Sequence, residues 1–271
     1  MKTALLTLLQ KLDEKSSKEM GIIPWSCPVP AFGNLSNARV ATLGINPSNR
    51  EFVDNSGREL SGGSRRFHTL NSLGLGSWSE AKAQHLQLIL HSCMTYFSTN
   101  PYDGWFKQLD FILGETSSSY YPSLLMGDGN EACHLDLIPY ATSSKWTSLT
   151  QNQRELLLSF SGNVLGLLLR DSPVTLLVLN GSAVVNNFQS ITGMPLEKEI
   201  MKSWVLPRQS QPDVKGIAYI GKISQIAGVK LNRQIAVAGY NHNLQSSFGV
   251  TRSVRESIRH WVGQVAGEVL K

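Results

Sequence analysis

Cysteine is scarce in this sequence, with only Cys27, Cys93 and Cys133 among 271 residues. None of them forms a Cys-x-x-Cys pair, so the sequence offers neither a disulfide framework nor the ligand spacing of a zinc or iron–sulfur site. Three scattered cysteines are typical of buried, reduced thiols in a cytoplasmic protein. The sequence therefore predicts a cytoplasmic protein that carries no metal ion and no cofactor.

Long apolar runs are absent too, and charge is sparse. No segment approaches the ~20 apolar residues that a helix needs to cross a bilayer, so we expect no membrane contact. The apolar residues 4–9 lead directly into charged residues without a small-residue cleavage site, which favours an amphipathic helix over a signal peptide. Charged residues make up only 17% of the chain, which argues against a disordered tail protein. The net charge of +5 permits a nucleic-acid partner without requiring one.

Two nucleotide-binding signatures are missing from the sequence. There is no phosphate-binding loop that ends in Lys, and no Gly-x-Gly-x-x-Gly follows a predicted strand. Both absences weigh against an unrelated α/β transferase or nucleotide hydrolase.

The chain does contain short apolar segments that alternate with helical patterns, which is typical of a parallel α/β sheet. We predict one domain, a three-layer α/β sandwich around a central four-stranded, mainly parallel sheet. Residues 1–37 form an N-terminal helix and an irregular segment packed on this domain, and the Gly-rich residues 48–78 form a long loop of the kind that usually has a function. The predicted central strands are residues 38–45, 132–138, 174–179 and 234–239, the edge strands lie within 216–230, and the helices are 3–20, 79–98, 102–115, 150–170 and one that Thr251 caps.

A polar residue stands at the end of each predicted central strand: Asn46, Asp136, Asn180 and His242. In an open α/β sheet, ligands bind where the carboxyl ends of the strands open into a crevice. Each residue also has a purely structural interpretation. Asn46 could belong to a turn with the following proline, Asp136 to a cap or ion pair, and His242 to the sheet edge. For Asn180 the structural interpretation, a turn that starts a helix, is favoured.

The order of these residues resembles that of the motifs in the uracil-DNA glycosylase superfamily. Gly44-Ile45-Asn46-Pro47-Ser48 is similar to the first motif, a Gly-x-Asp/Asn-Pro turn that carries Asn in the mismatch-specific and single-strand-selective branches. Residues 134–139 look like the second motif. Residues 242–247 stand in the place of the last motif but lack its usual prolines. The resemblance covers roughly residues 38–260 and implies the fold of that superfamily.

The resemblance implies a monofunctional DNA glycosylase, which flips a nucleotide out of the stack and breaks the bond between base and sugar. Asn46 would then hold the attacking water, and His242 would donate a hydrogen bond to O2 of the base. Phe67, or alternatively Phe52, would stack on the base. The predicted DNA-binding residues are Arg65, Arg66, Leu244, Gln245, Ser246, Ser247, Arg252 and Arg255, with Leu244 and Phe248 as candidate wedges and an ordinary solvated charge as the alternative for each arginine. Nothing in the sequence requires more than a monomer.

Two departures from the uracil pattern indicate the base. Asp136 replaces an Asn that reads uracil, and a carboxylate pairs with an exocyclic amine such as cytosine N4. Ser48 replaces a Tyr that blocks C5 of the ring, which leaves room for a substituent. The sequence therefore favours release of a 5-substituted cytosine, for example glucosylated hydroxymethylcytosine of phage DNA, in anti-phage defence. Two alternatives stay open: a uracil or mismatch repair glycosylase, with Asp136 protonated or placed outside the pocket, and a non-catalytic DNA-binding module.

Overall fold

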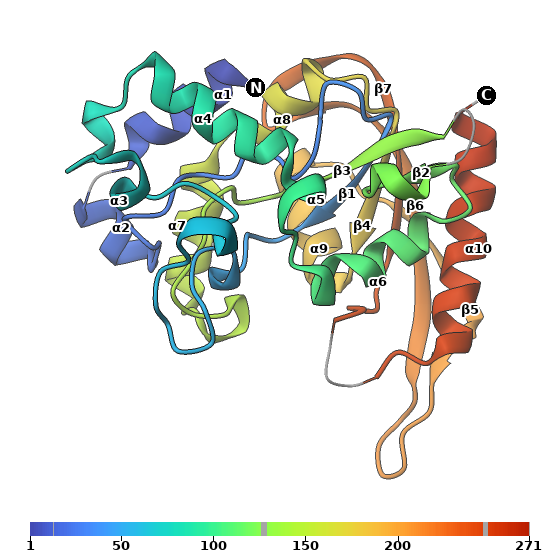
Figure 1. Ribbon diagram of the computed structural model, residues 1–271. Coiled ribbons are helices and arrows are strands. Elements are labelled where there is room, and N and C mark those ends of the chain that lie inside the picture. The colour runs from blue at the N-terminus through green and yellow to red at the C-terminus, as the bar shows by residue number, and fades with distance from the viewer. Residues whose placement is uncertain (13, 126–128, 246–248, 271) are drawn as a thin grey trace.

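The computed structural model describes residues 1–12, 14–125, 129–245 and 249–270 (Figure 1). This part of the chain holds a seven-stranded sheet in the order β2-β3-β1-β4-β7-β6-β5. The strands are β1 (Val40–Gly44), β2 (Ser118–Ser119), β3 (Asn130–Asp136), β4 (Leu176–Asn180), β5 (Glu197–Leu206), β6 (Val214–Ile226) and β7 (Val229–Tyr240).

The four predicted central strands correspond to β3, β1, β4 and β7, which pair in parallel. The prediction of an α/β fold is thus confirmed, but the prediction of a four-stranded sheet is wrong. The two-residue β2 extends the sheet beyond β3, and the antiparallel strands β6 and β5 extend it beyond β7. Residues 197–202 mix acidic, basic and apolar side chains and are mostly exposed, so β5 has no clear apolar pattern from which a strand could be predicted.

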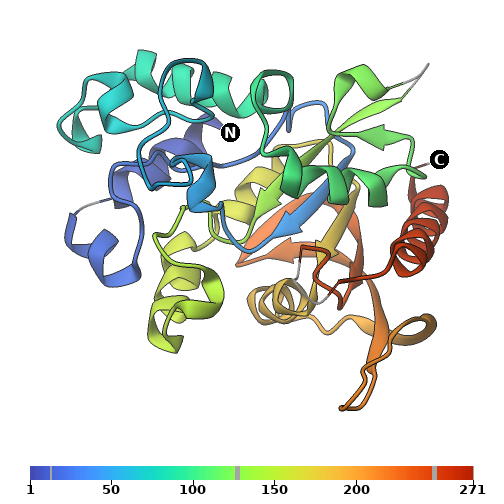
Figure 2. The ribbon, with the colours of Figure 1, turned by 60° about the horizontal axis from the view of Figure 1, so that its bottom comes forward.

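Helices cover both faces of the sheet (Figures 1 and 2). One apolar cluster contains buried side chains of α4, α6 and α10, and the other contains those of α7, α8 and α9. Side chains alternate along a strand, so Val40 joins the first cluster and Ala41 the second. The helices are α1 (Lys2–Lys11), α2 (Glu14–Met20), α3 (Leu70–Leu73), α4 (Ala83–Met94), α5 (Tyr96–Thr99), α6 (Asp103–Leu113), α7 (Gln151–Ser161), α8 (Val164–Arg170), α9 (Ser182–Thr192) and α10 (Arg252–Val269).

Several predicted helices are shorter than the sequence indicated. Residues 150–170 split into α7 and α8 at Gly162, whose φ of 57° ends the first helix. Residues 3–20 split into α1 and α2, and residues 79–98 into α4 and α5. The cap of α10 is confirmed, because Thr251 Oγ1 accepts a hydrogen bond from the Val254 backbone N–H.

The N-terminal segment lies against the sheet domain through Leu5 and Leu8, which are fully buried in the two apolar clusters. The three cysteines are buried and free. Within the described residues, none of the helices combines the length and the apolar character that a membrane span requires.

Candidate functional site

Four strand ends form a continuous row at the carboxyl edge of the parallel sheet. Gly44 of β1 pairs with Asp136 of β3, and Asn180 of β4 pairs with Tyr240 of β7. Because Leu43 pairs with Leu179, Gly44 and Asn180 follow at the same level. The row therefore reads Asp136, Gly44, Asn180 and Tyr240 across neighbouring strands, and Asp136 and Asn180 flank a residue without a side chain.

Gly44 has no side chain, so side chains of the neighbouring strand β3 can lie over β1 at this position. A Cβ atom at this position would lie 2.9 Å from His134 Nε2 and would collide with Asp136 Oδ1. Any larger residue would have to displace both side chains. The glycine of the first motif therefore lets a carboxylate and an imidazole lie across β1.

Asp136 is a buried carboxyl group, with only 6% of the residue exposed. Its Oδ1 lies 3.3 Å from His134 Nε2. Among the described residues its Oδ2 has no hydrogen-bond or ion-pair partner. A carboxylate oxygen only accepts hydrogen bonds, so this unoccupied acceptor is a candidate contact for a ligand that brings a donor.

His134 belongs to a buried chain of polar side chains. Its Nδ1 lies 2.6 Å from Thr42 Oγ1, which also hydrogen-bonds the Tyr120 hydroxyl. A carboxylate only accepts hydrogen bonds, so the neutral imidazole that suits Asp136 carries its hydrogen on Nε2 and accepts from Thr42 on Nδ1. The rings of Phe32, Trp105 and Phe106 surround the imidazole with centroids 5.1–5.5 Å away.

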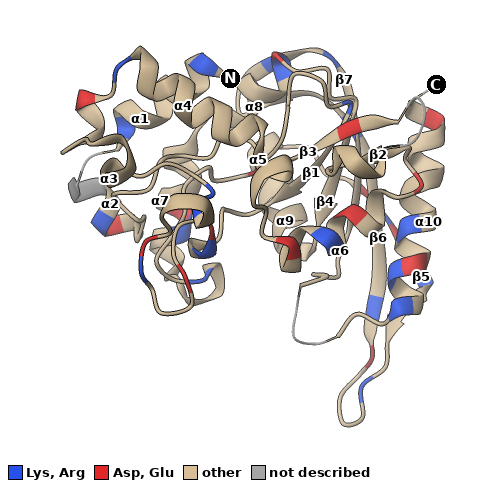
Figure 3. Ribbon diagram, in the orientation of Figure 1, with Lys and Arg blue, Asp and Glu red and all other residues tan. Residues whose placement is uncertain are grey.

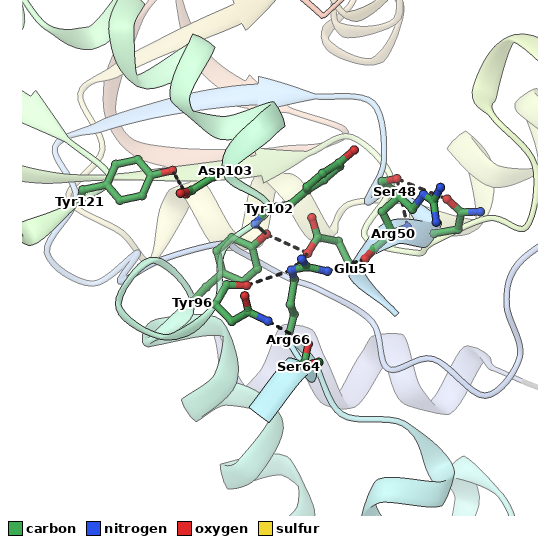
Figure 4. Close-up of polar contacts among 11 residues, drawn as sticks. Ser48, Arg50, Glu51, Ser64, Arg66, Tyr96, Tyr102, Asp103 and Tyr121 are labelled. Atoms are coloured by element: carbon green, nitrogen blue, oxygen red, sulfur yellow. Dashed lines mark hydrogen bonds and ion pairs between the residues drawn. The ribbon is translucent and has the colours of Figure 1, made fainter. Parts of the chain in front are cut away.

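Glu51 is a second buried acid that the sequence analysis missed. It lies in the short helix Asn49–Glu51 that follows the first motif, and it is 2% exposed. Burial raises its pKa to about 8; the Tyr96 hydrogen bond and the charge of Arg66 oppose that rise, and the charge of Asp136 adds to it. Tyr96 and Arg66 are both directed at this carboxyl group (Figure 4). An acid three residues after the end of a site motif is a weak signal, because nothing in the neighbouring sequence predicts that its side chain is buried.

Arg66 hydrogen-bonds one residue inside the long loop 48–78 and one outside it. Its Nε donates to Asn100 O at 2.9 Å and its NH1 donates to Arg50 O at 2.8 Å. The guanidinium group also lies 5.6 Å from the centre of the Tyr102 ring. Two of its donors are therefore used within the protein. A cavity of about 320 Å³ lies beside it, lined by residues from 50–66 and by Asn100 and Tyr102.

Asn46 is half-buried, and its amide orientation is set by its neighbours. Its Nδ2 donates to Thr142 Oγ1 at 3.1 Å and lies 3.5 Å from the acceptor Tyr140 O. The Thr142 hydroxyl donates onward to Ser144 O, so toward Asn46 it can only accept. Within the described residues Oδ1 of Asn46 has no partner and is available to accept a hydrogen bond from a water molecule.

Ser48 has a local structural task beside its predicted role at C5. Its Oγ accepts the Arg50 backbone N–H at 3.2 Å and so caps the short helix that carries Glu51. The side chain is half-buried. Ser48 is therefore a small side chain at the position predicted to face C5 of the base, and it also helps to position Glu51.

His242 is buried and its donor is already used. Its Nε2 lies 2.6 Å from Trp204 O, and because a carbonyl only accepts, this nitrogen carries the hydrogen. Burial lowers the pKa of His242, which favours the neutral ring. Donation to O2 of a base would therefore require His242 to leave Trp204 or to gain a second proton.

The predicted aromatic and apolar contacts lie in the core. Phe52 and Phe67 are each 1% exposed, and Leu244 is 4% exposed. The Phe67 ring is stacked on Tyr96 with a centroid distance of 5.1 Å. In this conformation these side chains form the wall beneath the site and present no free face to a base.

The remaining predicted DNA contacts are scattered. Arg65 is half-buried, Arg252 is exposed and pairs with Glu256 at 2.8 Å, and Arg255 is half-buried with a buried Nε that lacks a partner. Acidic and basic side chains alternate along α10 (Figure 3). Ser246 and Ser247, and the candidate wedge Phe248, lie outside the described residues.

Asn180 is brought into the site more closely than the sequence indicated. The following Gly181 has a φ of 94° and precedes α9, so the predicted turn is present. The Asn180 side chain is nevertheless buried beside Gly44, with the residue only 6% exposed, and its Oδ1 is buried without a partner. Its Nδ2 donates to Gln245 Oε1 at 2.9 Å, and Gln245 Nε2 donates to Trp105 O at 3.3 Å.

No protein-family description matches the chain, and no curated protein is similar to it. In the part of the chain that the structure describes, no three His, Cys, Asp or Glu side chains are placed to hold a metal ion together. The site is therefore interpreted from its own geometry. Among the described residues, Asp136 and Asn180 carry unpartnered oxygens on the two strands that flank Gly44, and Asn46 carries one two residues after it.

Proposed function

We propose that this protein is a DNA glycosylase that flips out a 5-substituted cytosine and hydrolyses its bond to the sugar, leaving an abasic site. The observation that carries the proposal is the buried Asp136 carboxyl group, whose Oδ2 lacks a partner at the same edge as Asn46. The order of motifs along the chain supports the reaction class.

The chemistry of Asp136 supports an amine-bearing base. A carboxylate can accept a hydrogen bond from the exocyclic amine of cytosine, but it repels O4 of uracil. The imidazole of His134 lies 3.3 Å from Oδ1, so Oδ2 is the carboxyl oxygen that remains to face the base. An amine that fills the empty acceptor position would also offset the cost of burying that oxygen.

Asn46 is suited to position the water. Because its NH2 group is engaged by Thr142, its oxygen can accept a hydrogen bond from a water and direct it at C1′ of the sugar. The bond from C1′ to the base breaks with its electron pair on the base, the water oxygen bonds to C1′, and the water proton passes to the base. An amide is too weak a base to take that proton, so Asn46 acts by positioning.

The neighbourhood of Ser48 supports a substituent on C5. Its short side chain stands where the uracil enzymes of the resembled superfamily have a blocking Tyr. Arg50, two residues after Ser48, lines a cavity of about 320 Å³, a volume within the size range of small-molecule sites. Selection through C5 would protect unmodified host cytosine, so bulky cytosines of phage DNA are the proposed target, and defence against phage is the proposed role.

Two alternatives keep specific support. A uracil or mismatch repair glycosylase would need Asp136 protonated. A non-catalytic DNA-binding module is favoured by two observations, the engaged donor of His242 and the burial of Phe52 and Phe67.

A base-release assay decides among these functions. Oligonucleotides, single- and double-stranded, would carry cytosine, uracil, 5-methylcytosine, 5-hydroxymethylcytosine or its glucosylated form, and abasic sites would be detected as alkali-sensitive breaks. We expect breaks only at a 5-substituted cytosine, and loss of these breaks in Asn46→Ala but not in the control Asn152→Ala, which changes an exposed residue of α7. Release of uracil alone would refute the argument from Asp136, and DNA binding without any break would support the non-catalytic alternative.

A further inference from the structure

Three groups are joined by hydrogen bonds at the carboxyl edge of the parallel strands: the side chains of Asn180 and Gln245 and the backbone carbonyl of Trp105. Asn180 Nδ2 donates to Gln245 Oε1 at 2.9 Å, and Gln245 Nε2 donates to the backbone carbonyl of Trp105 at 3.3 Å. These hydrogen bonds join the end of β4, the loop after β7 and the first turn of α6. At their free end lies Asn180 Oδ1, a buried acceptor without a partner.

The carbonyl of Trp105 fixes the direction of these hydrogen bonds. A carbonyl can only accept, so the amide of Gln245 must turn its NH2 group toward Trp105 and its oxygen toward Asn180. Asn180 must then turn its own NH2 group toward Gln245, which leaves its oxygen pointing away. A ligand that satisfies Asn180 Oδ1 must therefore bring a donor.

Asp136 and Asn180 are spaced to share one donor group. Val178 and Val40 lie in the same apolar cluster, and alternation puts Asn180, Gly44 and Asp136 on this face of the sheet. Two strand spacings separate β3 from β4, or about 9.6 Å. An amine that donates two hydrogen bonds of about 2.9 Å bridges oxygens about 5 Å apart. Short side chains on the two strands that flank β1 can reach that separation, with the base above the Asp136 and His134 side chains that cover Gly44.

We propose that Asn180 and Asp136 together recognise the extruded base by hydrogen bonds. In the DNA-free protein, Gln245 accepts the hydrogen bond from Asn180 Nδ2 that the base would otherwise accept. The inference rests on the proposed function and specifies how the base is recognised. One amine hydrogen of cytosine N4 goes to Asp136 Oδ2 and the other to Asn180 Oδ1, while Asn180 Nδ2 donates to N3. The same two oxygens reject O4 of uracil, since all three atoms are acceptors.

The side-chain amide of Gln245 imitates the edge of the base that replaces it. It accepts from Asn180 Nδ2, as cytosine N3 would, and it carries an adjacent NH2 group, as C4 of cytosine does. Gln245 lies in the segment that the resemblance assigns to insertion into the duplex. Displacement of Gln245 by the arriving base would thus free Asn180.

The first test measures specificity. In Asn180→Ala, kcat/KM for the released 5-substituted cytosine should fall about 10- to 100-fold, mainly through KM, and the ratio of this value to that for uracil should fall as well. The matched control is Asn187→Ala, on the exposed side of α9, whose amide donates only to Ala183 O within its own helix. Equal ratios in Asn180→Ala and the wild type, with Tm unchanged, would overturn the assignment.

The second test uses free nucleobases and needs no catalysis. Cytosine, 5-hydroxymethylcytosine and uracil would be titrated against the DNA-free protein while the fluorescence of Trp105 and the other tryptophans is followed. Gln245→Ala should bind the two cytosine bases about tenfold more tightly than the wild type, and the double variant with Asn180→Ala should lose this gain. Equal affinities in the wild type and Gln245→Ala would refute the occupancy of the base position by Gln245. If these affinities change as expected but no oligonucleotide is cleaved, the proposed reaction fails while base recognition stands.

Discussion

Tyr96 donates its hydroxyl hydrogen to Glu51 Oε2 at 2.8 Å, and both groups are buried next to the predicted site. Arg66 stands 3.9 Å from the same oxygen, but burial outweighs its charge and raises the pKa of Glu51 to about 8. The carboxyl group is therefore protonated near neutral pH, although a basic side chain lies beside it.

This pKa predicts how stability depends on pH. The folded protein holds the Glu51 proton more tightly than the unfolded chain does, so its contribution is complete below pH 4.5 and is lost as the pH rises toward 8. In that window, Glu51 should lower the free energy of unfolding by up to about 1.4 kcal/mol per pH unit. Denaturant titrations at pH 5, 7 and 9 should show this decline in the wild type and a smaller one in Glu51→Gln, which keeps an acceptor for Tyr96. Parallel declines in both proteins would contradict the prediction.

The missing side chain at Gly44 gives the second prediction. Gly44→Ala places a methyl group against Asp136 Oδ1 and His134 Nε2, so both side chains must shift. We expect a loss of about 1–3 kcal/mol in the free energy of unfolding and a loss of base release greater than this destabilisation explains. The control is Gly63→Ala in the long loop 48–78, where a methyl group would meet no atom within 4 Å. Full activity of Gly44→Ala would exclude the space over Gly44 as the base position.

The parallel core was predictable because its strands are buried on both faces. β1 and β4 consist almost entirely of apolar residues, so short runs bounded by turn residues were sufficient to place them and the polar residues at their ends. β5 was not predictable, because one of its faces is exposed and its first residues alternate in charge. The number of strands was underestimated for that reason.

The partners of the site residues could not be read from the sequence. His242 donates to Trp204, which belongs to the unpredicted β5, so the sequence offered no reason to expect its hydrogen to be engaged. The burial of Glu51 depends on Tyr96, which is 45 positions away. Local patterns indicated which residues stand at the sheet edge, but long-range packing decides which of their atoms remain free.

Asp136 gives the third prediction, a change of base specificity. Asp136→Asn supplies a donor as well as an acceptor at the position that the carboxylate now holds, so O4 of uracil is no longer repelled. Release of the 5-substituted cytosine should fall by about 10- to 100-fold and release of uracil should rise, measured as kcat/KM on oligonucleotides that differ only in the base. Asp171→Asn, which alters an exposed acid paired with Arg170, should leave both values unchanged. A variant that loses both activities while remaining folded would show that Asp136 serves a different purpose from reading the amine.

His242 gives the last prediction. Its Nε2–H donates to Trp204 O, so a structural role and a catalytic role predict different results for its variants. The lowered pKa of His242 means that the unfolded chain binds this proton more readily than the folded one, so the stability that depends on His242 is present above about pH 6.5 and decreases as the pH falls below it. His242→Gln can still donate to Trp204 O, and it should remove this decrease while remaining folded. His242→Ala should cost about 1–3 kcal/mol at pH 7.5, because the buried carbonyl then has no donor. If His242 only holds Trp204 O, base release by His242→Gln at pH 7.5 will be near the wild-type rate. A loss of more than about 100-fold would instead show that the ring leaves Trp204 during the reaction and donates to the base.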